Sequence, residues 1–298
     1  MKKRVFYFNI NYNCDNKCVF CYSHNTIFGD SFKKSLSLKE FKEYAYKYKI
    51  GKGDRIILNG GEPLLHREIN DYLKYIYLNN LETIIYTNGR NINKLLPIYL
   101  ESNIRFVVPI HGNQIIHDEI TGISGSYSDT INSLKWLKKN GKKVLVDMKI
   151  ILNNKTVEEM GFLNSLKTWE RIDFNNSIHI TMMADTLVSQ SNGCKTLDKE
   201  NVSYYTNKLY NVFKNKNKLK IYDTCINSLE ILEEKTIEKY NYNIDLHYKD
   251  NVLEKKIHLK KNTSYCNKEC NLKEFCISEV SEHKVLEIDK DKIYENME

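Results

Sequence analysis

The chain of 298 residues is poor in proline and glycine, with 3 and 12 residues respectively. This scarcity argues against long disordered linkers. No apolar run reaches the length of a membrane-spanning helix. The basic start, Met1–Arg4, leads into an aromatic, strand-like stretch and not into the apolar segment of a signal peptide. We therefore expect a cytoplasmic protein built as one large domain, or as one domain with an appendage.

The chain also lacks a strong excess of charge. Its 45 Lys and Arg residues and 38 Asp and Glu residues leave a net charge of +7, which is mild for this length. The lysines are spread along the sequence, which favours a solvated surface over a nucleic-acid-binding patch. We expect no nucleic-acid partner and no membrane. An acidic peptide would suit the charge, but this is weak evidence.

Cysteine is well represented, with eight residues. Disulfides are not expected in a cytoplasmic protein. The cysteines form two groups and two single positions: Cys14, Cys18 and Cys21; Cys266, Cys270 and Cys276; and Cys194 and Cys225. Groups at both ends of the chain suggest metal sites.

The first group has the spacing C-x3-C-x2-C. Three thiolates can hold three corners of a [4Fe–4S] cubane, which leaves one iron open to a ligand that is not protein. A zinc site is the alternative, with His24 as the fourth ligand. The spacing, with Phe20 before and Tyr22 after the last cysteine, resembles the cluster motif of the radical S-adenosylmethionine (SAM) superfamily.

Strand-like and helix-like segments alternate through the first two-thirds of the chain. Six short apolar runs predict buried parallel strands, at Val5–Asn11, Arg55–Leu58, Thr83–Tyr86, Arg105–Ile110, Val144–Leu152 and Ile178–Met183. Capping boxes at Ser37–Glu40 and Thr156–Glu159 predict helix starts, and Asp198–Asn215 a polar-faced helix. The α/β pattern predicts a partial (β/α)6 TIM-like barrel over residues 1–186, followed by a smaller region, 187–298.

Two motifs follow predicted strands directly. Asn59-Gly60-Gly61-Glu62-Pro63 resembles the segment with which radical SAM enzymes hold the methionine end of SAM. Adjacent glycines permit close backbone approach, Glu62 can accept hydrogen bonds from the ammonium group, and Pro63 sets the turn. Thr87-Asn88-Gly89 resembles the T-N-G found in the same superfamily near the ribose and methionine of SAM. By the same resemblance, Asn153 is a further SAM contact, and Phe20 belongs to the cofactor site.

Residues 109–126 resemble the fourth-strand exit of radical SAM maturases that modify peptides, such as those of His-Xaa-Ser-type systems. Within this stretch, His111 is either a residue of the substrate cavity or a structural histidine. We predict that His117-Asp118 is a loop and helix-start element. The resemblance implies a peptide substrate.

The late cysteines read C-x3-C-x5-C, and Cys225 completes a set of four thiolates with Cys266, Cys270 and Cys276. Four thiolates suit one fully ligated cluster or one zinc ion. The group resembles the auxiliary-cluster segments of SPASM and twitch appendages, although their usual spacing is C-x2-C-x5-C. We therefore expect a small C-terminal Fe–S appendage with one auxiliary [4Fe–4S] cluster. Cys194 is either a buried apolar cysteine or a hydrogen-atom donor to a substrate radical.

The resemblance implies a radical SAM enzyme that cleaves SAM reductively to a 5′-deoxyadenosyl radical. We expect this enzyme to modify a ribosomally made peptide by hydrogen-atom abstraction, giving a crosslink, an epimerisation or an oxidation. Oxidation or rearrangement of a small molecule such as an aminosugar is the alternative, and a non-catalytic zinc or Fe–S protein is the second. The chain begins at its first strand, so we expect leader binding to use the barrel, the appendage or a separate protein. A flavodoxin- or ferredoxin-like protein is the expected electron donor.

Overall fold

The computed structural model describes residues 5–21, 35–101, 103–141, 143–172, 176–183, 187–213, 218–222, 243–249 and 252–258. Its strands are β1 (Val5–Asn11), β2 (Arg55–Gly60), β3 (Glu82–Tyr86), β4 (Ile104–Pro109), β5 (Leu145–Leu152), β6 (Ser177–Met182), β7 (Lys218–Tyr222), β8 (Asn243–Lys249) and β9 (Val252–His258). Its helices are α1 (Leu38–Lys47), α2 (Ile69–Leu78), α3 (Gln114–Thr121), α4 (Ser126–Asn140), α5 (Glu159–Arg171), α6 (Leu187–Ser191) and α7 (Lys199–Phe213), with short 3₁₀ turns η2 (Pro63–Leu65), η3 (Ile92–Lys94) and η4 (Pro97–Glu101).

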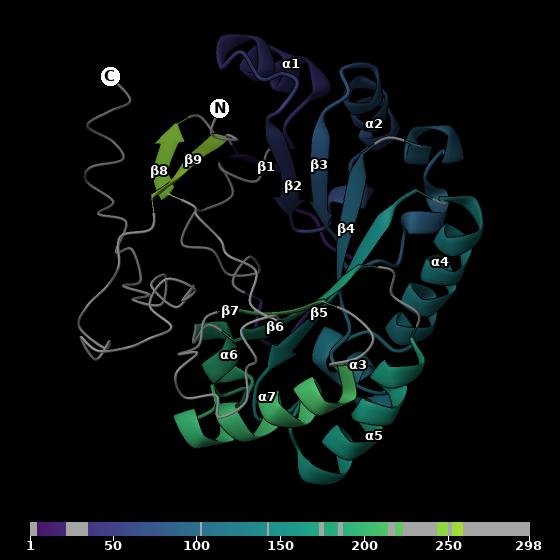
Figure 1. Ribbon diagram of the computed structural model, residues 1–298, viewed down its shortest axis with the longest axis vertical. Coiled ribbons are helices and arrows are strands. Elements are labelled where there is room, and N and C mark those ends of the chain that lie inside the picture. Colours follow the sequence, from purple (N-terminus) through teal and green to yellow (C-terminus); the bar gives the residue numbers. More distant parts are fainter. Residues whose placement is uncertain are drawn as a thin grey trace.

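All nine strands belong to one sheet, in the order β7-β6-β5-β4-β3-β2-β1-β9-β8. Strands β1 to β7 pair in parallel, and the hairpin β8–β9 joins β1 in the antiparallel sense. In Figure 1, β5–β7 run across the direction of β1–β3, as expected for a strongly twisted and curled sheet. Strands β7 and β8 stand at the two ends of the order, so the described sheet is open. This architecture confirms the predicted partial barrel.

The six predicted strands match β1–β6 closely, because buried apolar runs mark parallel strands well. The sheet continues further than predicted, through β7 and the hairpin. These three strands lie beyond residue 186, so the sheet spans the expected boundary, and the division of the chain there stays a prediction.

The two faces of the sheet carry different side chains. On one face, residues such as Phe6, Phe8 and Phe106 belong to the large core that packs beneath the helices. On the other face, Val5, Ile57, Ile84 and Val107 form a small separate cluster, with Tyr7 and Tyr86 packed against it. Alternation along each strand assigns neighbouring residues to opposite faces. The described helices therefore cover the first face, and we call the other face the inner face (Figure 1).

The helix starts show one confirmed and one wrong prediction. Helix α1 has the predicted capping box between Ser37 and Glu40. The capping box predicted at Thr156 is absent, because α5 starts three residues later and its N-cap, Glu158, makes no side-chain cap bond. Thr156 instead donates its hydroxyl to the carbonyl of Asn153 at 2.9 Å. Polar side chains that bond to nearby backbone compete in this way with helix formation.

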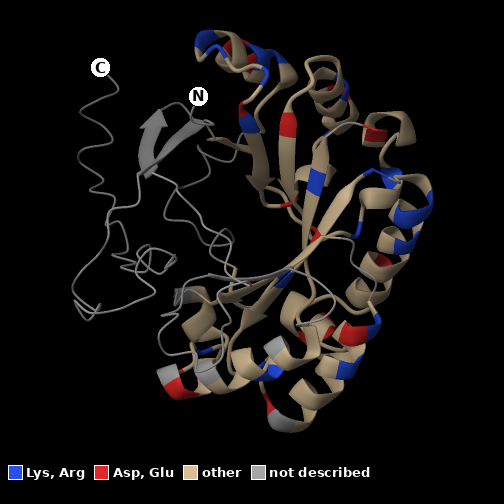
Figure 2. Cartoon of the chain, viewed as in Figure 1, with Lys and Arg blue, Asp and Glu red and all other residues tan. Residues whose placement is uncertain are grey.

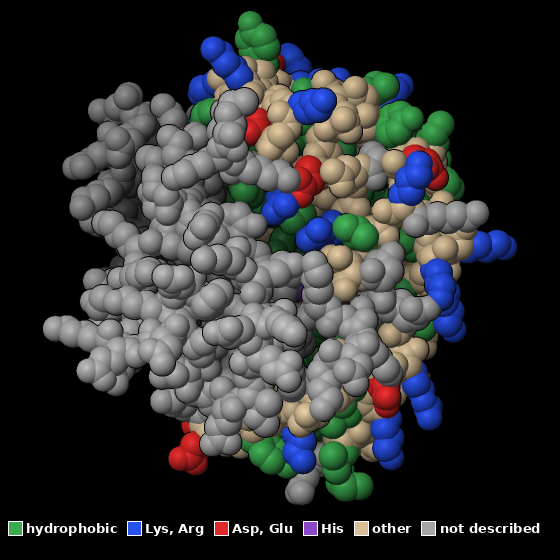
Figure 3. Space-filling model, viewed as in Figure 1, with side chains coloured by type: hydrophobic (Ala, Val, Ile, Leu, Met, Phe, Trp, Pro, Cys, Tyr) green, Lys and Arg blue, Asp and Glu red, His purple; other side chains and the backbone are tan. Residues whose placement is uncertain are grey.

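The helix predicted at Asp198–Asn215 is confirmed as α7. In Figure 2 the Lys and Arg positions are scattered over helices and strands, and in Figure 3 their side chains do not gather in one patch on the visible described surface. No helix of the described residues is long and apolar enough to cross a membrane.

Candidate functional site

The three N-terminal cysteines lie in the loop that follows β1. Cys14, Cys18 and Cys21 are partly exposed and carry free thiols. The backbone N–H of Cys21 donates to the carbonyl of Cys18 at 3.0 Å, which closes a tight turn. The backbone N–H of Asn16 donates to the sulfur of Cys14 at 3.4 Å. We call residues 12–21 the cysteine loop.

The end of helix α3 holds the cysteine loop on one side. The N–H groups of Lys17 and Val19 donate to the carbonyls of Thr121 and Ile120 at 2.7 and 2.9 Å. These carbonyls belong to the last turn of α3, where intrahelical partners are missing, so the loop satisfies them. Helix α3 ends at Gly122 in the left-handed conformation, and a Cβ there would lie 3.0 Å from the carbonyl oxygen of Lys17.

Asp118 fixes the corner between α3 and α4. Its carboxylate accepts hydrogen bonds from the N–H groups of Gly125 and Tyr127 and from the hydroxyl of Ser126, at 2.7 to 2.9 Å. These bonds cap α4, whose N-terminal N–H groups need acceptors. The predicted helix-start role is therefore half right: Asp118 caps α4, but His117 and Asp118 themselves lie inside α3. The corner between α3 and α4 therefore supports the cysteine loop.

Gly60 and Gly61 make the close approach between the β2 exit and the cysteine loop. A Cβ at Gly60 would lie 1.9 Å from the carbonyl oxygen of Asn11, and one at Gly61 would lie 2.5 Å from that of Asn13. The N–H of Gly61 donates to Asn11 at 2.6 Å, and the N–H of Glu62 donates to Asn13 at 2.7 Å. The glycines thus allow two backbone segments to meet. We expected them to admit a ligand, and that role stays a prediction.

Glu62 is a fully buried carboxylate at this junction. It accepts hydrogen bonds from the N–H of Leu64 at 2.9 Å, the hydroxyl of Thr87 at 2.6 Å and the N–H of Asn88 at 2.6 Å. Burial raises the pKa of Glu62 from its ordinary value to about 7, although these three bonds pull it down. Among the described residues, Glu62 has no cationic partner. Pro63 follows at the first position of turn η2.

Thr87 and Asn88 lie at the exit of β3, beside Glu62. Thr87 is buried, and its hydroxyl also accepts the N–H of Gly89 at 3.0 Å. The side-chain amide of Asn88 donates to the carboxylate of Asp15 at 2.6 Å. The predicted residues Glu62, Thr87 and Asn88 are therefore brought together, and Asn88 connects them to the cysteine loop.

Phe20 of the cysteine loop packs against two buried histidines. Its ring meets that of His111 edge-on at 5.2 Å, and His111 stacks on His117 at 5.3 Å. Burial lowers the pKa of His111 well below its ordinary value and that of His117 to about 4, so both rings are neutral at pH 7. Nδ1 of His111 and Nε2 of His117 are buried and have no hydrogen-bond partner among the residues that the structure describes.

Asn153 and Cys194 lie on neighbouring loops beyond β5 and β6. Asn153 is buried, and its side-chain oxygen accepts the N–H groups of Lys155 and Thr156, so it shapes its own turn. Its predicted contact with SAM stays a prediction. The thiol of Cys194 is buried 3.3 Å from the sulfur of Met183, and burial raises its pKa to about 11. Two residues earlier, Asn192 donates to the carbonyl of Val19 at 3.0 Å, which brings this loop to the cysteine loop.

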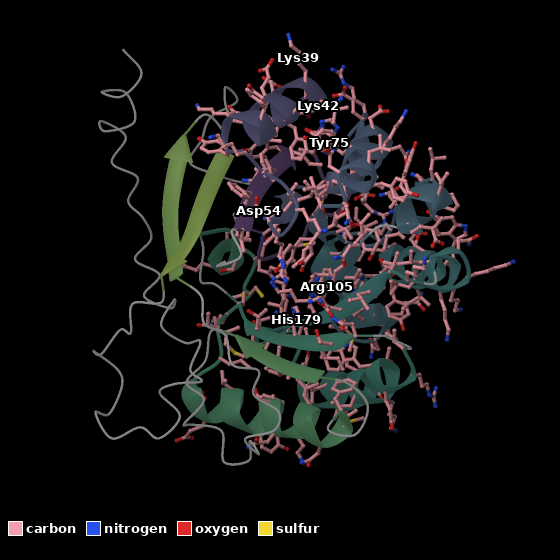
Figure 4. The ribbon with its side chains drawn as sticks, turned by 45° about the horizontal axis from the view of Figure 1, so that its top comes forward. Lys39, Lys42, Asp54, Tyr75, Arg105 and His179 are labelled. Carbon is pink, nitrogen blue, oxygen red and sulfur yellow. The ribbon has the colours of Figure 1, made fainter. Side chains whose placement is uncertain are left out.

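A second polar cluster lies on the inner face, in the amino-terminal half of β4–β6. Asp147 lies near both Arg105 and His179, with nitrogen–oxygen distances of 3.8 and 3.3 Å. Figure 4 labels Arg105 and His179. The buried carboxylate of Asp147 also accepts the N–H and the hydroxyl of Ser177, at 2.9 and 2.7 Å. These bonds and the nearby His179 lower the pKa of Asp147 despite its burial. This cluster links β4, β5 and β6 near their amino-terminal ends. The cysteine loop lies at the opposite ends, where the parallel strands of the sheet terminate.

The cysteine loop suits an iron–sulfur cluster. Burial raises the pKa of Cys14 to about 11 and raises that of Cys18 further, and the neighbouring thiols add to both shifts. Thiols with a raised pKa, such as those of Cys14 and Cys18, need a nearby cation to deprotonate them, and cluster irons supply that charge. No three His, Cys, Asp or Glu side chains among the described residues converge on a point suited to a single ion. A cubane instead takes one thiolate per iron.

The pair formed by Glu62 and the cysteine loop also suits SAM. The Glu62 carboxylate has three of about four acceptor directions occupied and no cation beside it in the described part of the chain, so it can accept one more donor, such as an ammonium group. Tyr22 and His24 lie outside the described residues, as do Cys225, Cys266, Cys270 and Cys276.

Sequence reasoning missed several residues of this site. Asp15 lies between two of the cysteines and accepts from Asn91 as well as from Asn88, and Arg90 contacts both Asp15 and Asn16. Their partners lie more than 70 positions away, so local periodicity carried no signal. A charged residue inside the cysteine motif and an arginine directly after Thr87-Asn88-Gly89 were the available signals.

Comparison with known proteins agrees with this site. The model of the radical SAM superfamily matches residues 8–166. Among curated proteins, the Fe-coproporphyrin III synthase of Methanosarcina barkeri is 25% identical over 173 residues, which is 57% of this chain and 42% of that protein. The antilisterial bacteriocin subtilosin biosynthesis protein AlbA of Bacillus subtilis is 26% identical over 151 residues, covering 49% of this chain and 33% of AlbA. The chain thus spans less than half the length of either relative.

Among solved structures, Streptococcus suis SuiB bound to its precursor peptide SuiA has a TM-score of 0.59 at 14% identity, covering 74% of this chain and 48% of SuiB. At this identity the likeness shows the fold alone. The superfamily match covers more than half of the chain and contains the cysteine loop, Glu62 and Asn88. This chain therefore belongs to the radical SAM superfamily, whose members use a [4Fe–4S] cluster and SAM.

Proposed function

We propose that this enzyme modifies a ribosomally made peptide by hydrogen-atom abstraction, with a [4Fe–4S] cluster on Cys14, Cys18 and Cys21 and with SAM beside Glu62. The observation that carries the proposal is the backbone contact between Glu62 and the cysteine loop, which places a buried carboxylate with no cationic partner among the described residues beside that loop. The fold likeness to a maturase solved with its precursor peptide, and the sequence likeness to a bacteriocin biosynthesis protein, support a peptide substrate.

When bound, the cluster and SAM supply a 5′-deoxyadenosyl radical by one-electron reductive cleavage. The residues of the chain bind and orient the cluster and SAM. Glu62 neutralises the ammonium group of SAM, and its fixed hydrogen bonds from Thr87 and Asn88 hold its oxygens in place. Gly60, Gly61 and Pro63 set the backbone path that brings Glu62 to the cysteine loop.

Phe20 and the neutral pair of His111 and His117 form an uncharged group of rings next to the cysteine loop. Their neutrality suits a role in keeping water and protons away from a reactive intermediate. We propose that His111 borders the substrate cavity. Asn153 contributes by shaping the loop beyond β5, and a SAM contact there remains part of the proposal.

Cys194 is proposed as the hydrogen-atom donor for an epimerisation outcome. Its thiol is protonated at pH 7, since burial raises its pKa to about 11. It lies two residues from Asn192, which contacts the cysteine loop. Both features suit a donor close to the radical, but a thiyl product then needs an external electron and proton, which the proposed flavodoxin- or ferredoxin-like donor and solvent supply.

We also propose that Cys225, Cys266, Cys270 and Cys276 hold one auxiliary [4Fe–4S] cluster in a SPASM- or twitch-like region, with zinc as the alternative occupant. Their number and their grouping late in the chain support this assignment. We propose that a leader sequence is recognised by the barrel, by residues 187–298 or by a separate protein.

A small-molecule substrate is the second candidate. The likeness to the Fe-coproporphyrin III synthase supports it, since that name describes a reaction on a porphyrin and not on a peptide. Oxidation or rearrangement of a compound such as an aminosugar is another reaction on a small-molecule substrate.

Mass spectrometry separates the two candidates. The enzyme is coexpressed anaerobically with small peptides encoded beside it, and each peptide is compared with the product formed with the Cys18→Ala variant. A loss of two mass units, or a new D-residue after hydrolysis, that depends on Cys18 supports the peptide proposal. Unchanged peptides with no D-residues, together with turnover of a small metabolite by the same preparation, would contradict it.

A further inference from the structure

Arg90 joins three parts of the site that are distant in sequence. Its Nη1 donates to the carbonyl of Asp15 at 2.8 Å and to Oδ1 of Asn16 at 3.1 Å. Its Nε and Nη2 donate to Asp129 of α4 at 3.2 and 2.9 Å. The carbonyl of Arg90 accepts the hydroxyl of Ser133, also on α4, at 2.9 Å. The guanidinium group is therefore held on one side by α4 and presented on the other to the cysteine loop.

The carboxylate of Asp15 belongs to the same network. Asn88 donates to Oδ1 at 2.6 Å, Asn91 donates to Oδ2 at 2.8 Å, and Nη1 of Arg90 lies 3.5 Å from Oδ2. Asp15 stands between Cys14 and Cys18, where a lone negative charge would oppose two thiolates. The partners on the β3 exit offset that charge and tie the loop to the edge that carries Glu62.

Asn16 connects Arg90 to the sulfurs. Its backbone N–H donates to the sulfur of Cys14 at 3.4 Å. Burial raises the pKa of the Cys18 thiol, and the side chain of Asn16, as a hydrogen-bond partner of that thiol, offsets a part of the rise. Because Oδ1 of Asn16 accepts from Arg90, the amide is oriented with its N–H₂ group available to Cys18.

We propose that Arg90 is a positioning residue that raises the reduction potential of the cluster by fixing Asn16 against the sulfurs of Cys14 and Cys18. Hydrogen bonds to cluster sulfurs stabilise the additional negative charge of the reduced state, and outer partners that orient the donor tune the metal centre. This inference rests on the cluster assignment of the proposed function, and not on the identity of the substrate.

The test is a redox titration of the reconstituted full-length protein, followed by electron paramagnetic resonance in the absence of SAM and substrate. The variants are Arg90→Gln, Arg90→Lys and Asn16→Ala, with Arg171→Gln as the control, because Arg171 is exposed at the end of α5. Iron content and the melting temperature of the apoprotein are measured on each, so that cluster loss and misfolding are separated from a change of potential.

We expect Arg90→Gln to keep its iron but to show about a tenfold lower ratio of reduced to oxidised cluster at a fixed potential, which is about 59 mV for a one-electron couple. Arg90→Lys gives a smaller shift in the same direction, since lysine cannot reproduce the planar fork. The double variant Arg90→Gln/Asn16→Ala is no lower than Asn16→Ala alone, because Arg90 acts through Asn16. Arg171→Gln matches the wild type.

Equal potentials in the wild type and both Arg90 variants would overturn the inference, as would additive shifts in the double variant. Loss of the cluster from Arg90→Gln, with a wild-type potential in Arg90→Lys, would also overturn it, because Arg90 would then serve retention and not tuning. A wild-type protein that binds zinc and no iron would overturn the cluster assignment itself. Substrate assays are independent of all these results.

Discussion

The hydroxyl of Thr87 donates a hydrogen bond of 2.6 Å to the carboxylate of Glu62, across 25 residues of sequence. This contact joins the exits of β2 and β3 in the interior of the protein, where Glu62 is fully buried. A buried carboxylate is costly unless it is well bonded or paired with a cation. Glu62 has hydrogen bonds, but it has no cationic partner among the described residues. This imbalance makes it the strongest candidate for contact with the ammonium group of SAM.

The imbalance predicts a pH dependence of the apoprotein. Since the pKa of Glu62 is raised to about 7 in the folded state, the unfolded chain releases this proton at lower pH than the folded chain does. The free energy of unfolding therefore falls as pH rises from about 4.5 to about 7, by up to roughly 3 kcal/mol. Glu62→Gln lacks this decline. Urea denaturation of the wild-type and Glu62→Gln apoproteins between pH 5 and 7.5 measures the free energy of unfolding of each. Both proteins contain the same histidines, so the contribution of these cancels in the difference. Equal changes of the free energy of unfolding with pH in the two proteins would refute the prediction.

Gly61→Ala should separate the β2 exit from the cysteine loop. The added Cβ would lie 2.5 Å from the carbonyl oxygens of both Tyr12 and Asn13, which are backbone atoms that cannot move alone. We expect a loss of about 2 kcal/mol or more in the free energy of unfolding, together with weaker retention of iron. Gly51→Ala is the matched control, since its Cβ meets nothing within 4 Å. Equal stabilities of the two variants would show that the contact at Gly61 is unimportant.

Asp147→Ala tests the cluster on the inner face. The change removes the acceptor of the Ser177 N–H and the partner of Arg105 and His179. A buried donor without an acceptor and the uncompensated charge of Arg105 together cost about 3 kcal/mol. Chemical denaturation of the apoprotein measures this loss, with the exposed Asp71→Ala as the control, for which we expect a change below about 1 kcal/mol. A smaller effect at Asp147 would show that the cluster does not stabilise β4–β6.

Cys270→Ala tests the late cysteine group. If this group holds a cubane, iron analysis of the anaerobically reconstituted protein should fall from about eight to about four atoms per chain, with the cluster of the cysteine loop retained. Unchanged iron with a loss of one zinc atom would support the zinc alternative. Product formation should be lost, while cleavage of SAM without substrate continues.

The sequence predicted the parts of the fold that repeat locally. Buried apolar runs placed β1–β6 within a few residues, and the two motifs fell at strand exits, where parallel sheets build sites. Glu62, Thr87 and Asn88 were therefore expected near one another, and their hydrogen bonds confirm the proximity.

Long-range polar contacts were not predictable in the same way. The contacts of Asp15 with Asn88 and Arg90 depend on how two loops meet. These residues are not part of a periodic sequence pattern that would predict the contacts. The false capping box at Thr156 arose because Asn153 offers the same hydroxyl a local acceptor, which a sequence pattern does not reveal. Seven parallel strands and a hairpin appeared where six strands were expected, since β7 follows only after two further helices.

Release of 5′-deoxyadenosine from SAM tests the central claim most directly. The reconstituted protein is incubated anaerobically with SAM and dithionite, with and without the reductant, and the Cys18→Ala and Glu62→Gln variants are treated in parallel. We predict reductant-dependent release by the wild type, none by Cys18→Ala, and a fall of at least about tenfold for Glu62→Gln, which a loss of about 1.4 kcal/mol of binding would produce. Undiminished release by Cys18→Ala would contradict the assignment of the cluster to the cysteine loop.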